Sequence, residues 1–106
     1  MIPKPGKPVR GSRTGRPLMA LLDLLGRRWT LRILWELRRG PFTFAELQAR
    51  CDTMSPSVLN QRIGELRDSR IIEHRGDGYE LTAEGKSLLA SIAPLDDWAK
   101  RWARRV

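Results

Sequence analysis

The chain has 106 residues, a formal net charge of +8 and 41% hydrophobic residues, which fits one globular domain. The lone cysteine, Cys51, excludes an intramolecular disulfide, and with a single histidine, His74, it disfavours a structural zinc site. We therefore expect no metal and no other cofactor. The apolar run at residues 18–22 is too short to cross a bilayer, and no signal-peptide pattern surrounds it. A cytoplasmic protein without a membrane partner is expected.

The excess positive charge lies at the two ends of the chain. Residues 1–16 carry five basic side chains and no acid, and residues 98–106 carry four more basic side chains. The middle holds 11 basic and 12 acidic side chains, so an argument for nucleic-acid binding must rest on local geometry. Residues 1–16 predict a disordered basic arm before a folded domain at 17–106. We hypothesise that the arm supplies electrostatic contact with DNA; a purely solubilising role or a partial cloning remnant are the alternatives.

Periodicity, caps and turn residues predict the order of elements in the folded domain. Ser55 suits an N-cap and Pro56 a first helical residue, so a helix is predicted to begin there. Thr43 and Glu46 form a capping box at the start of a short helix. The expected elements are helices at 17–25 and 30–39, a short strand at 42–43, helices at 43–51 and 55–69, strands at 71–75 and 79–81, and a last helix after Thr82. The fold is therefore expected to be mainly α with a small β-hairpin (α+β), in a winged helix-turn-helix arrangement.

The helix at 55–69 is the predicted recognition helix. A helical wheel gathers Leu59, Ile63 and Leu66 into a stripe for burial. The opposite face carries Ser57, Gln61, Gly64 and Asp68, with Asn60 and Glu65 on its flanks. The acids Glu65 and Asp68 repel phosphate, so the C-terminal half of the helix is expected to point away from DNA.

The polar residues near the start of this helix suit base recognition. Asn and Gln pair with adenine, and Ser donates or accepts a hydrogen bond; the alternative is an ordinary solvated surface. A phosphate contact is predicted at the helix start at Thr43, and Arg75 in the wing is predicted to approach the minor groove. Arg62 either reaches phosphate or pairs with a neighbouring carboxylate. The predicted DNA-binding residues are Thr43, Ser55, Ser57, Asn60, Gln61, Arg62 and Arg75.

The last helix carries an apolar stripe with spacings of four, three, three and four residues. Such a heptad-like stripe packs against another helix, either the first helix of the same chain or a second copy, and both can hold. A small domain has little core to cover two tryptophans near its end, which favours a dimer interface on the last helix. Pro94 predicts a kink or break near Ala90. The predicted interface residues are Leu18, Leu22, Leu88, Ile92, Leu95, Trp98 and Trp102.

Several ordered motifs resemble the HxlR family of bacterial winged-helix regulators, which is related to the MarR group. The resemblance covers residues 17–98 and implies a homodimer formed by the first and last helices, which presents two recognition helices to a pseudo-palindromic DNA site. The motifs that carry it are LLGRRWT at 24–30, ILWEL at 33–37, GP at 40–41, FAEL at 44–47, SPSVLNQRI at 55–63 and LTAEG at 81–85.

Three departures limit what the resemblance implies. Arg16 stands where oxidant-sensing members have a cysteine, which excludes thiol sensing at that place. Cys51 is interpreted as a small core residue rather than a redox switch. The turn at 76–78 makes a shorter wing than is usual, so wing contact with DNA should be reduced, and Gly64 replaces a larger, often basic, side chain.

These patterns predict a homodimeric transcriptional regulator that binds double-stranded DNA at a specific sequence. The main alternative is a winged-helix protein–protein interaction module with basic tails and no sequence preference. RNA binding is disfavoured because few aromatic residues are free to stack on bases. No catalytic constellation is present, so an enzyme is not expected. A small-molecule effector is left open, with Trp29, Trp35 and Trp98 as candidate lining residues.

Overall fold

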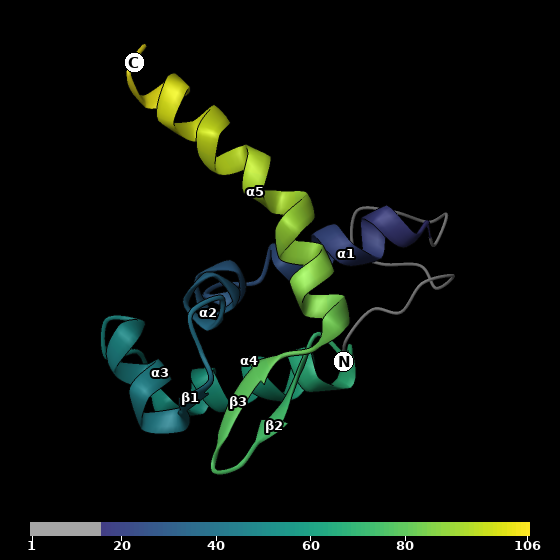
Figure 1. Ribbon diagram of the computed structural model, residues 1–106, viewed down its shortest axis with the longest axis vertical. Helices are drawn as coiled ribbons and strands as arrows, with labels where there is room; N and C mark the ends of the chain where they lie inside the picture. The colour runs from purple at the N-terminus through teal and green to yellow at the C-terminus, as the bar shows by residue number, and fades with distance from the viewer. Residues whose placement is uncertain (1–15) are drawn as a thin grey trace.

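The structure is a computed structural model that describes residues 16–106. All of the predicted basic arm except Arg16 therefore lies outside the described residues. Arg16 is exposed and is the N-cap of the first helix. In chain order the elements are α1 (Pro17–Leu25), α2 (Thr30–Leu37), β1 (Phe42–Thr43), α3 (Phe44–Arg50), α4 (Pro56–Asp68), β2 (Ile72–Arg75), β3 (Gly78–Leu81) and α5 (Ala83–Ala103). This order confirms the mainly helical fold with a small sheet (Figure 1).

The boundaries differ from the predicted ones by small amounts. Helix α2 ends at Leu37 rather than Arg39, because the amides of Arg38 and Arg39 donate to carbonyls only three residues back. Such bonds tighten the last turn before Gly40. The hairpin loop is shorter than predicted, since Arg75 pairs with Gly78 and only two residues separate the strands. Gly76 takes the first of these two positions with a φ of 59°, a conformation that favours glycine.

The sheet has three antiparallel strands in the order β1-β3-β2. The very short β1 pairs with β3, with Phe42 opposite Tyr79 and Thr43 opposite Gly78. This pairing was not predicted. It joins the segment before α3 to the wing, so the helix-turn-helix unit and the hairpin share one sheet.

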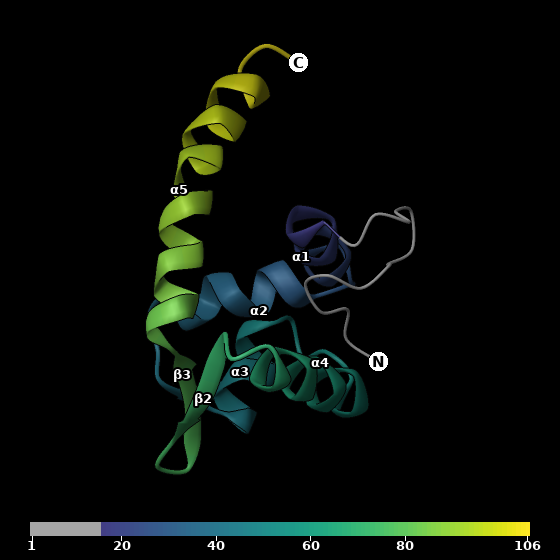
Figure 2. The same cartoon turned by 90° about the vertical axis from the view of Figure 1, so that its right-hand side faces the viewer.

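One hydrophobic core lies between the sheet and helices α2, α3 and α4. Figure 2 shows α2 crossing the centre of the domain, with α1 above it and α4 below it. Cys51 is fully buried in this core, as predicted, and burial raises the pKa of its thiol. The largest fully buried side chains are Ile33, Leu34, Leu47, Leu59, Leu66 and Ile72.

Helix α5 is continuous from Ala83 to Ala103, so of the kink or break predicted near Ala90 the break is wrong. Figures 1 and 2 show the helix changing direction part-way along its length. Pro94 removes only one backbone hydrogen bond, and both Ala90 and Pro94 are exposed, where water can satisfy the freed carbonyl. The beginning of α5 packs on α2, while its C-terminal half projects away from the domain (Figures 1 and 2).

The start of α5 is fastened to the turn between α4 and β2. The Thr82 hydroxyl donates to the Arg70 carbonyl at 2.7 Å and also accepts from the Gly85 amide at 3.0 Å. The Thr82 amide donates to the Ile71 carbonyl at 3.0 Å. A Cβ at Gly85 would collide with that same Ile71 carbonyl, so this close approach requires glycine.

Candidate nucleic-acid interface

The helix-turn-helix unit consists of α3, a turn and α4. The Thr43 amide donates to the Glu46 carboxylate at 2.8 Å, and the Thr43 hydroxyl accepts from the Glu46 amide at 3.2 Å. These bonds confirm the predicted capping box, and they hold the pKa of Glu46 below its ordinary value. The turn then reverses the chain through two positive φ angles, 57° at Asp52 and 54° at Thr53. Ser55 caps α4, its hydroxyl accepting from the Val58 amide at 3.4 Å.

Helix α4 has one buried face and one polar face. Leu59, Ile63 and Leu66 are buried at 0–2% exposure, which confirms the predicted stripe. The opposite surface presents Ser57, Asn60 and Gln61, all exposed, and the Ser57 hydroxyl lies 3.0 Å from that of Ser55. The structure thus brings four of the predicted contact residues together at the N-terminal half of one helix. Their hydroxyl and amide groups can both donate and accept hydrogen bonds.

Gly64 lies in the middle of α4 and has no packing reason to be glycine. A Cβ built at this position meets no heavy atom within 4 Å. A helix-interior glycine is less stable than alanine by about 0.5–1 kcal/mol. Because Gly64 has no side chain, the helix surface is less bulky at the centre of the polar face, and the helix is less stable than it would be with alanine there.

Arg62, a predicted DNA contact, is held within the protein. Its Nε donates to the Arg28 carbonyl at 2.8 Å, and its Nη1 donates to Glu65 at 3.0 Å. The side chain is only 15% exposed. Of the two alternatives left by the sequence, the structure contains the pairing with a carboxylate, and a phosphate contact by Arg62 stays a prediction.

Glu65 lies differently from its predicted place at the flank of the exposed face. Its carboxylate turns toward the segment after α1, where Arg27 donates to it at 2.6 Å, and its side chain is 11% exposed. Two arginines therefore pair with it, and the expected repulsion of phosphate by Glu65 stays a prediction. The helical wheel gave its angle correctly but not the partner toward which its side chain bends. Asp68 remains exposed.

The two remaining predicted contact residues, Thr43 and Arg75, lie apart from the polar face of α4. Both the amide and the hydroxyl of Thr43 are used by the capping box. Arg75 lies at the tip of the wing, 70% exposed, with a long 3.4 Å ion pair to Glu80. Sequence reasoning overlooked Arg67, which is exposed on α4 and follows Asn60 by seven residues, a spacing that keeps both on one side of the helix.

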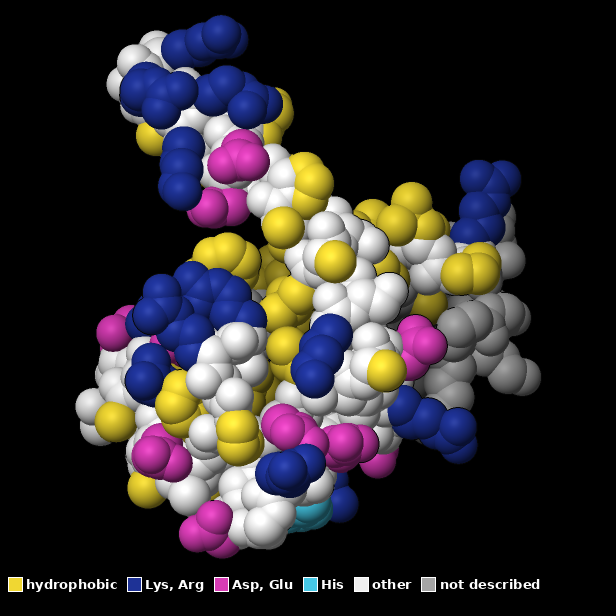
Figure 3. Space-filling model, viewed as in Figure 1, with side chains coloured by type: hydrophobic (Ala, Val, Ile, Leu, Met, Phe, Trp, Pro, Cys, Tyr) yellow, Lys and Arg dark blue, Asp and Glu magenta, His cyan; other side chains and the backbone are white. Residues whose placement is uncertain are grey.

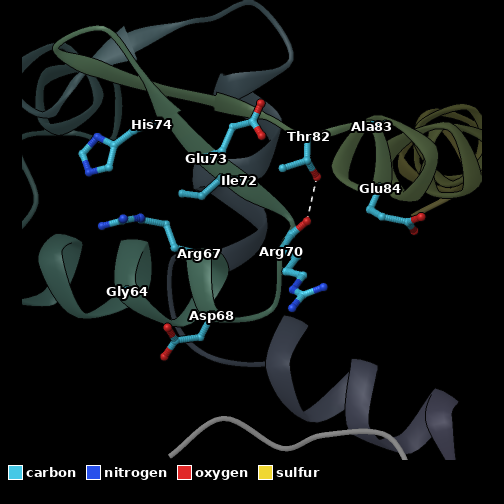
Figure 4. A pocket seen from close by; sticks show the side chains of 10 residues that line it. All are labelled: Gly64, Arg67, Asp68, Arg70, Ile72, Glu73, His74, Thr82, Ala83 and Glu84. Atoms are coloured by element: carbon cyan, nitrogen blue, oxygen red, sulfur yellow. Dashed lines mark hydrogen bonds between the residues drawn. The ribbon is translucent and has the colours of Figure 1, made fainter.

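A groove of about 630 Å³ separates α4 from β2 and the start of α5. In Figure 4 the Arg67 side chain and the His74 ring lie at the same end of this groove, one from each wall, and Gly64 lies on α4 at that end. The Thr82–Arg70 hydrogen bond lies toward the other end. Three acids, Asp68, Glu73 and Glu84, also line the groove, so its charge is mixed.

The predicted dimer residues divide into two groups. Leu88 is partly buried and packs against the core of its own chain, and Ile92 is half-buried. By contrast, the side chains toward the end of α5 and on α1 are half exposed or more, and Figure 3 shows hydrophobic side chains at the surface of both helices. The exposed group is Leu18, Leu22, Leu95, Trp98 and Trp102.

The tryptophans proposed to line an effector pocket are spread over the molecule. Trp98 stacks on Trp102 with ring centroids 5.9 Å apart, and these two rings line a hollow of about 240 Å³ with Arg101 and Arg105. Trp35 lies beneath the Arg38 guanidinium at 3.9 Å, and Trp29 packs against the core. The hollow beside Trp98 therefore does not include the other two tryptophans.

Within residues 16–106 no group of His, Cys, Asp and Glu side chains is arranged to hold a metal ion. None of the helices in the described part of the chain combines the length and the apolar character needed to span a membrane.

Comparison with known proteins identifies the family to which this chain is similar. The HxlR-like helix-turn-helix family matches residues 24–106. The HTH-type transcriptional regulator YodB of Bacillus subtilis is 30% identical over 87 residues, which cover 76% of this chain and 78% of YodB. The crystal structure of quinone-bound YodB superposes with a TM-score of 0.72 at 30% identity, covering 79% of this chain and 94% of that one. A possible HxlR family transcriptional factor from Thermoplasma volcanium gives 0.70 at 29% identity, with 79% and 82% covered.

Proposed function

Since the chain belongs to the HxlR-like family of helix-turn-helix transcriptional regulators, we propose that it binds a pseudo-palindromic DNA operator as a homodimer, with α4 of each protomer in the major groove. The observation that carries this proposal is the exposed polar face of α4, which lies opposite a fully buried stripe at the end of a capped helix-turn-helix unit. A helix in this position presents its N-terminal residues to base edges.

The base contacts are assigned to Ser57, Asn60 and Gln61. All three are exposed, and none of the hydrogen bonds described above occupies the amide groups of Asn60 and Gln61. Free amides can form the two parallel hydrogen bonds that adenine offers in the major groove. Ser55 and Ser57, whose hydroxyls already lie 3.0 Å apart, suit a phosphate or base at the helix start.

The dimer is assigned to α1 and the projecting half of α5. Leu18 and Leu95 are 61% and 60% exposed, and Trp98 and Trp102 are each 53% exposed. An isolated protomer would leave these apolar surfaces in water, and contiguous patches of this kind mark interfaces. A two-fold dimer would use the same patch on both copies and would present two copies of α4 with matching symmetry.

Footprinting of the protein on DNA upstream of its own coding sequence tests this function. We expect protection of two symmetric half-sites whose centres lie about 10 base pairs apart, or a multiple of that distance. A variant with Ser57, Asn60 and Gln61 all changed to alanine should keep its fold and lose the footprint. Equal binding to unrelated DNA by both proteins would favour the protein–protein interaction module instead.

A further inference from the structure

A chain of four charged side chains connects the end of α1 with α4. Arg27, in the turn after α1, donates to Asp23 of α1 at 3.2 Å and to Glu65 of α4 at 2.6 Å. Glu65 in turn accepts from Arg62 at 3.0 Å. We call these four residues the Glu65 bridge. Their side chains are only 10–16% exposed, so solvent screens the pairs weakly.

The Glu65 bridge has a second attachment to the same turn. Arg62 donates from its Nε to the Arg28 carbonyl at 2.8 Å, so neighbouring residues of the turn receive contacts from two positions of α4. Some other ion pairs connect residues within a single helix. Arg32 pairs with Glu36 inside α2, and Lys100 pairs with Asp96 inside α5.

The Glu65 bridge adds a directional constraint to the apolar packing of α4. The buried face of α4 consists of Leu59, Ile63 and Leu66, and apolar packing has no preferred direction. Charge-assisted hydrogen bonds are directional, and buried polar pairs are best attested as devices that fix register. The bridge therefore restricts rotation and sliding of α4 relative to α1.

Resting on the function proposed above, we infer that Glu65 is a positioning residue that sets the distance and angle between the two recognition helices of the dimer. Helix α1 belongs to the proposed dimer interface and α4 reads the DNA, so the joint between them determines which half-site spacing the dimer accepts. Glu65 itself contacts no base. Through this positioning, Glu65 affects which spacing between half-sites the dimer prefers, and it does not affect which bases are preferred.

The test compares Glu65→Gln with wild type on a set of operators whose half-sites are moved together or apart by one base pair. Wild type should prefer one spacing by about tenfold or more, and Glu65→Gln should reduce that preference to about threefold or less. Asn60→Ala should behave in the opposite way, losing base preference while keeping spacing preference. Glu36→Gln is the matched control, because Glu36 is a similarly shielded carboxylate that pairs with Arg32 and Arg50.

A second variant and a DNA-free measurement guard against misfolding. Arg27→Gln removes the charged link between Glu65 and the turn, while it leaves the Glu65–Arg62 pair and the hydrogen bond from Arg62 to the Arg28 carbonyl. Spin labels on Gln61→Cys in the two protomers should give a narrow distance distribution in wild type and a broader one in Arg27→Gln and Glu65→Gln.

Two results would overturn the inference while the proposed function stands: unchanged spacing preference with an unchanged distance distribution, or weaker binding in equal proportion at every spacing. The second result would mean that the bridge only stabilises the fold. Failure of wild type to bind any symmetric site would refute the proposed function, and this inference with it.

Discussion

Helices α4 and α5 carry similar apolar stripes with different surroundings. The stripe of α4 is buried completely within its own protomer, whereas that of α5 is partly buried at Leu88 and exposed from Leu95 onward. Both stripes follow helical spacing, so periodicity alone identifies an apolar face without saying what covers it. The difference separates a helix whose apolar face is covered by its own domain from one whose outer half leaves its apolar face exposed.

The largest effect is expected from damage to the α4 stripe. Leu59→Ala should lower the free energy of unfolding by about 2–5 kcal/mol, because Leu59 is fully buried and its truncation leaves a cavity. Chemical denaturation followed by circular dichroism measures this change. Leu95→Ala, at a 60% exposed position of α5, is the matched control. Similar losses in the isolated protomers of both variants would remove the distinction between the two stripes.

The exposed tryptophans of α5 should affect association instead of folding. Trp98→Ala should weaken the dimer by about 2 kcal/mol or more, because a large aromatic side chain at the centre of an interface contributes strongly to binding. Sedimentation equilibrium at several concentrations measures this, and the far-ultraviolet spectrum should stay unchanged. A wild-type protein that remains monomeric at high concentration would contradict the proposed interface.

The polar face of α4 should affect base preference without affecting either stripe. Asn60→Ala and Gln61→Ala should each reduce discrimination between operator bases by about 1–3 kcal/mol. Competition binding against operators changed at single positions gives this value. Ala45, which is exposed on α3, offers a control in Ala45→Ser, which should bind like wild type. If Asn60→Ala and Gln61→Ala discriminate as wild type does, the assigned reading face is wrong.

Gly64→Ala should increase the stability of the protein. Without a close neighbour at this position, alanine should stabilise the protein by about 0.5–1 kcal/mol. Gly85→Ala is the opposite case, since a Cβ there collides with the Ile71 carbonyl and should destabilise the protein. Thermal unfolding of the two variants measures both signs. A destabilised Gly64→Ala protein would mean that this surface is less open than described.

The smallest effect concerns acid pH and the start of α3. The Thr43 hydrogen bonds lower the pKa of Glu46 in the folded state, so they contribute stability that is present above the ordinary value of 4.5 and is lost as pH falls through the lowered pKa. Glu46→Gln should therefore flatten the decline in stability below about pH 4.5. Denaturation curves of both proteins between pH 3 and 7 compare them, and identical slopes would contradict the assignment.

The sequence predicted the cap and the buried and polar faces of α4 well, because each of these signals was local. The cap at Ser55 and the stripe from Leu59 to Leu66 depend on residues a few positions apart. The pairing of β1 with β3 was not predictable, since two residues carry no alternation that could identify a partner strand. Glu65 shows the same limit, because its partner Arg27 lies 38 positions away and a wheel gives only angles. At Pro94 a kink or break was predicted because proline removes one backbone hydrogen bond. The sequence does not show that this turn is exposed, where water can satisfy the freed carbonyl.

The buried thiol of Cys51 has a practical consequence. It is the chain's single cysteine, it has no solvent exposure, and burial raises its pKa, so reagents that attack thiolates should leave the folded protein unmodified. Its modification requires the core between α2, α3 and α4 to open. The rate of thiol alkylation therefore measures how often the helix-turn-helix unit opens, as amide hydrogen exchange does for the backbone. A comparison of this rate with and without the proposed operator DNA would show whether binding makes the helix-turn-helix unit more rigid.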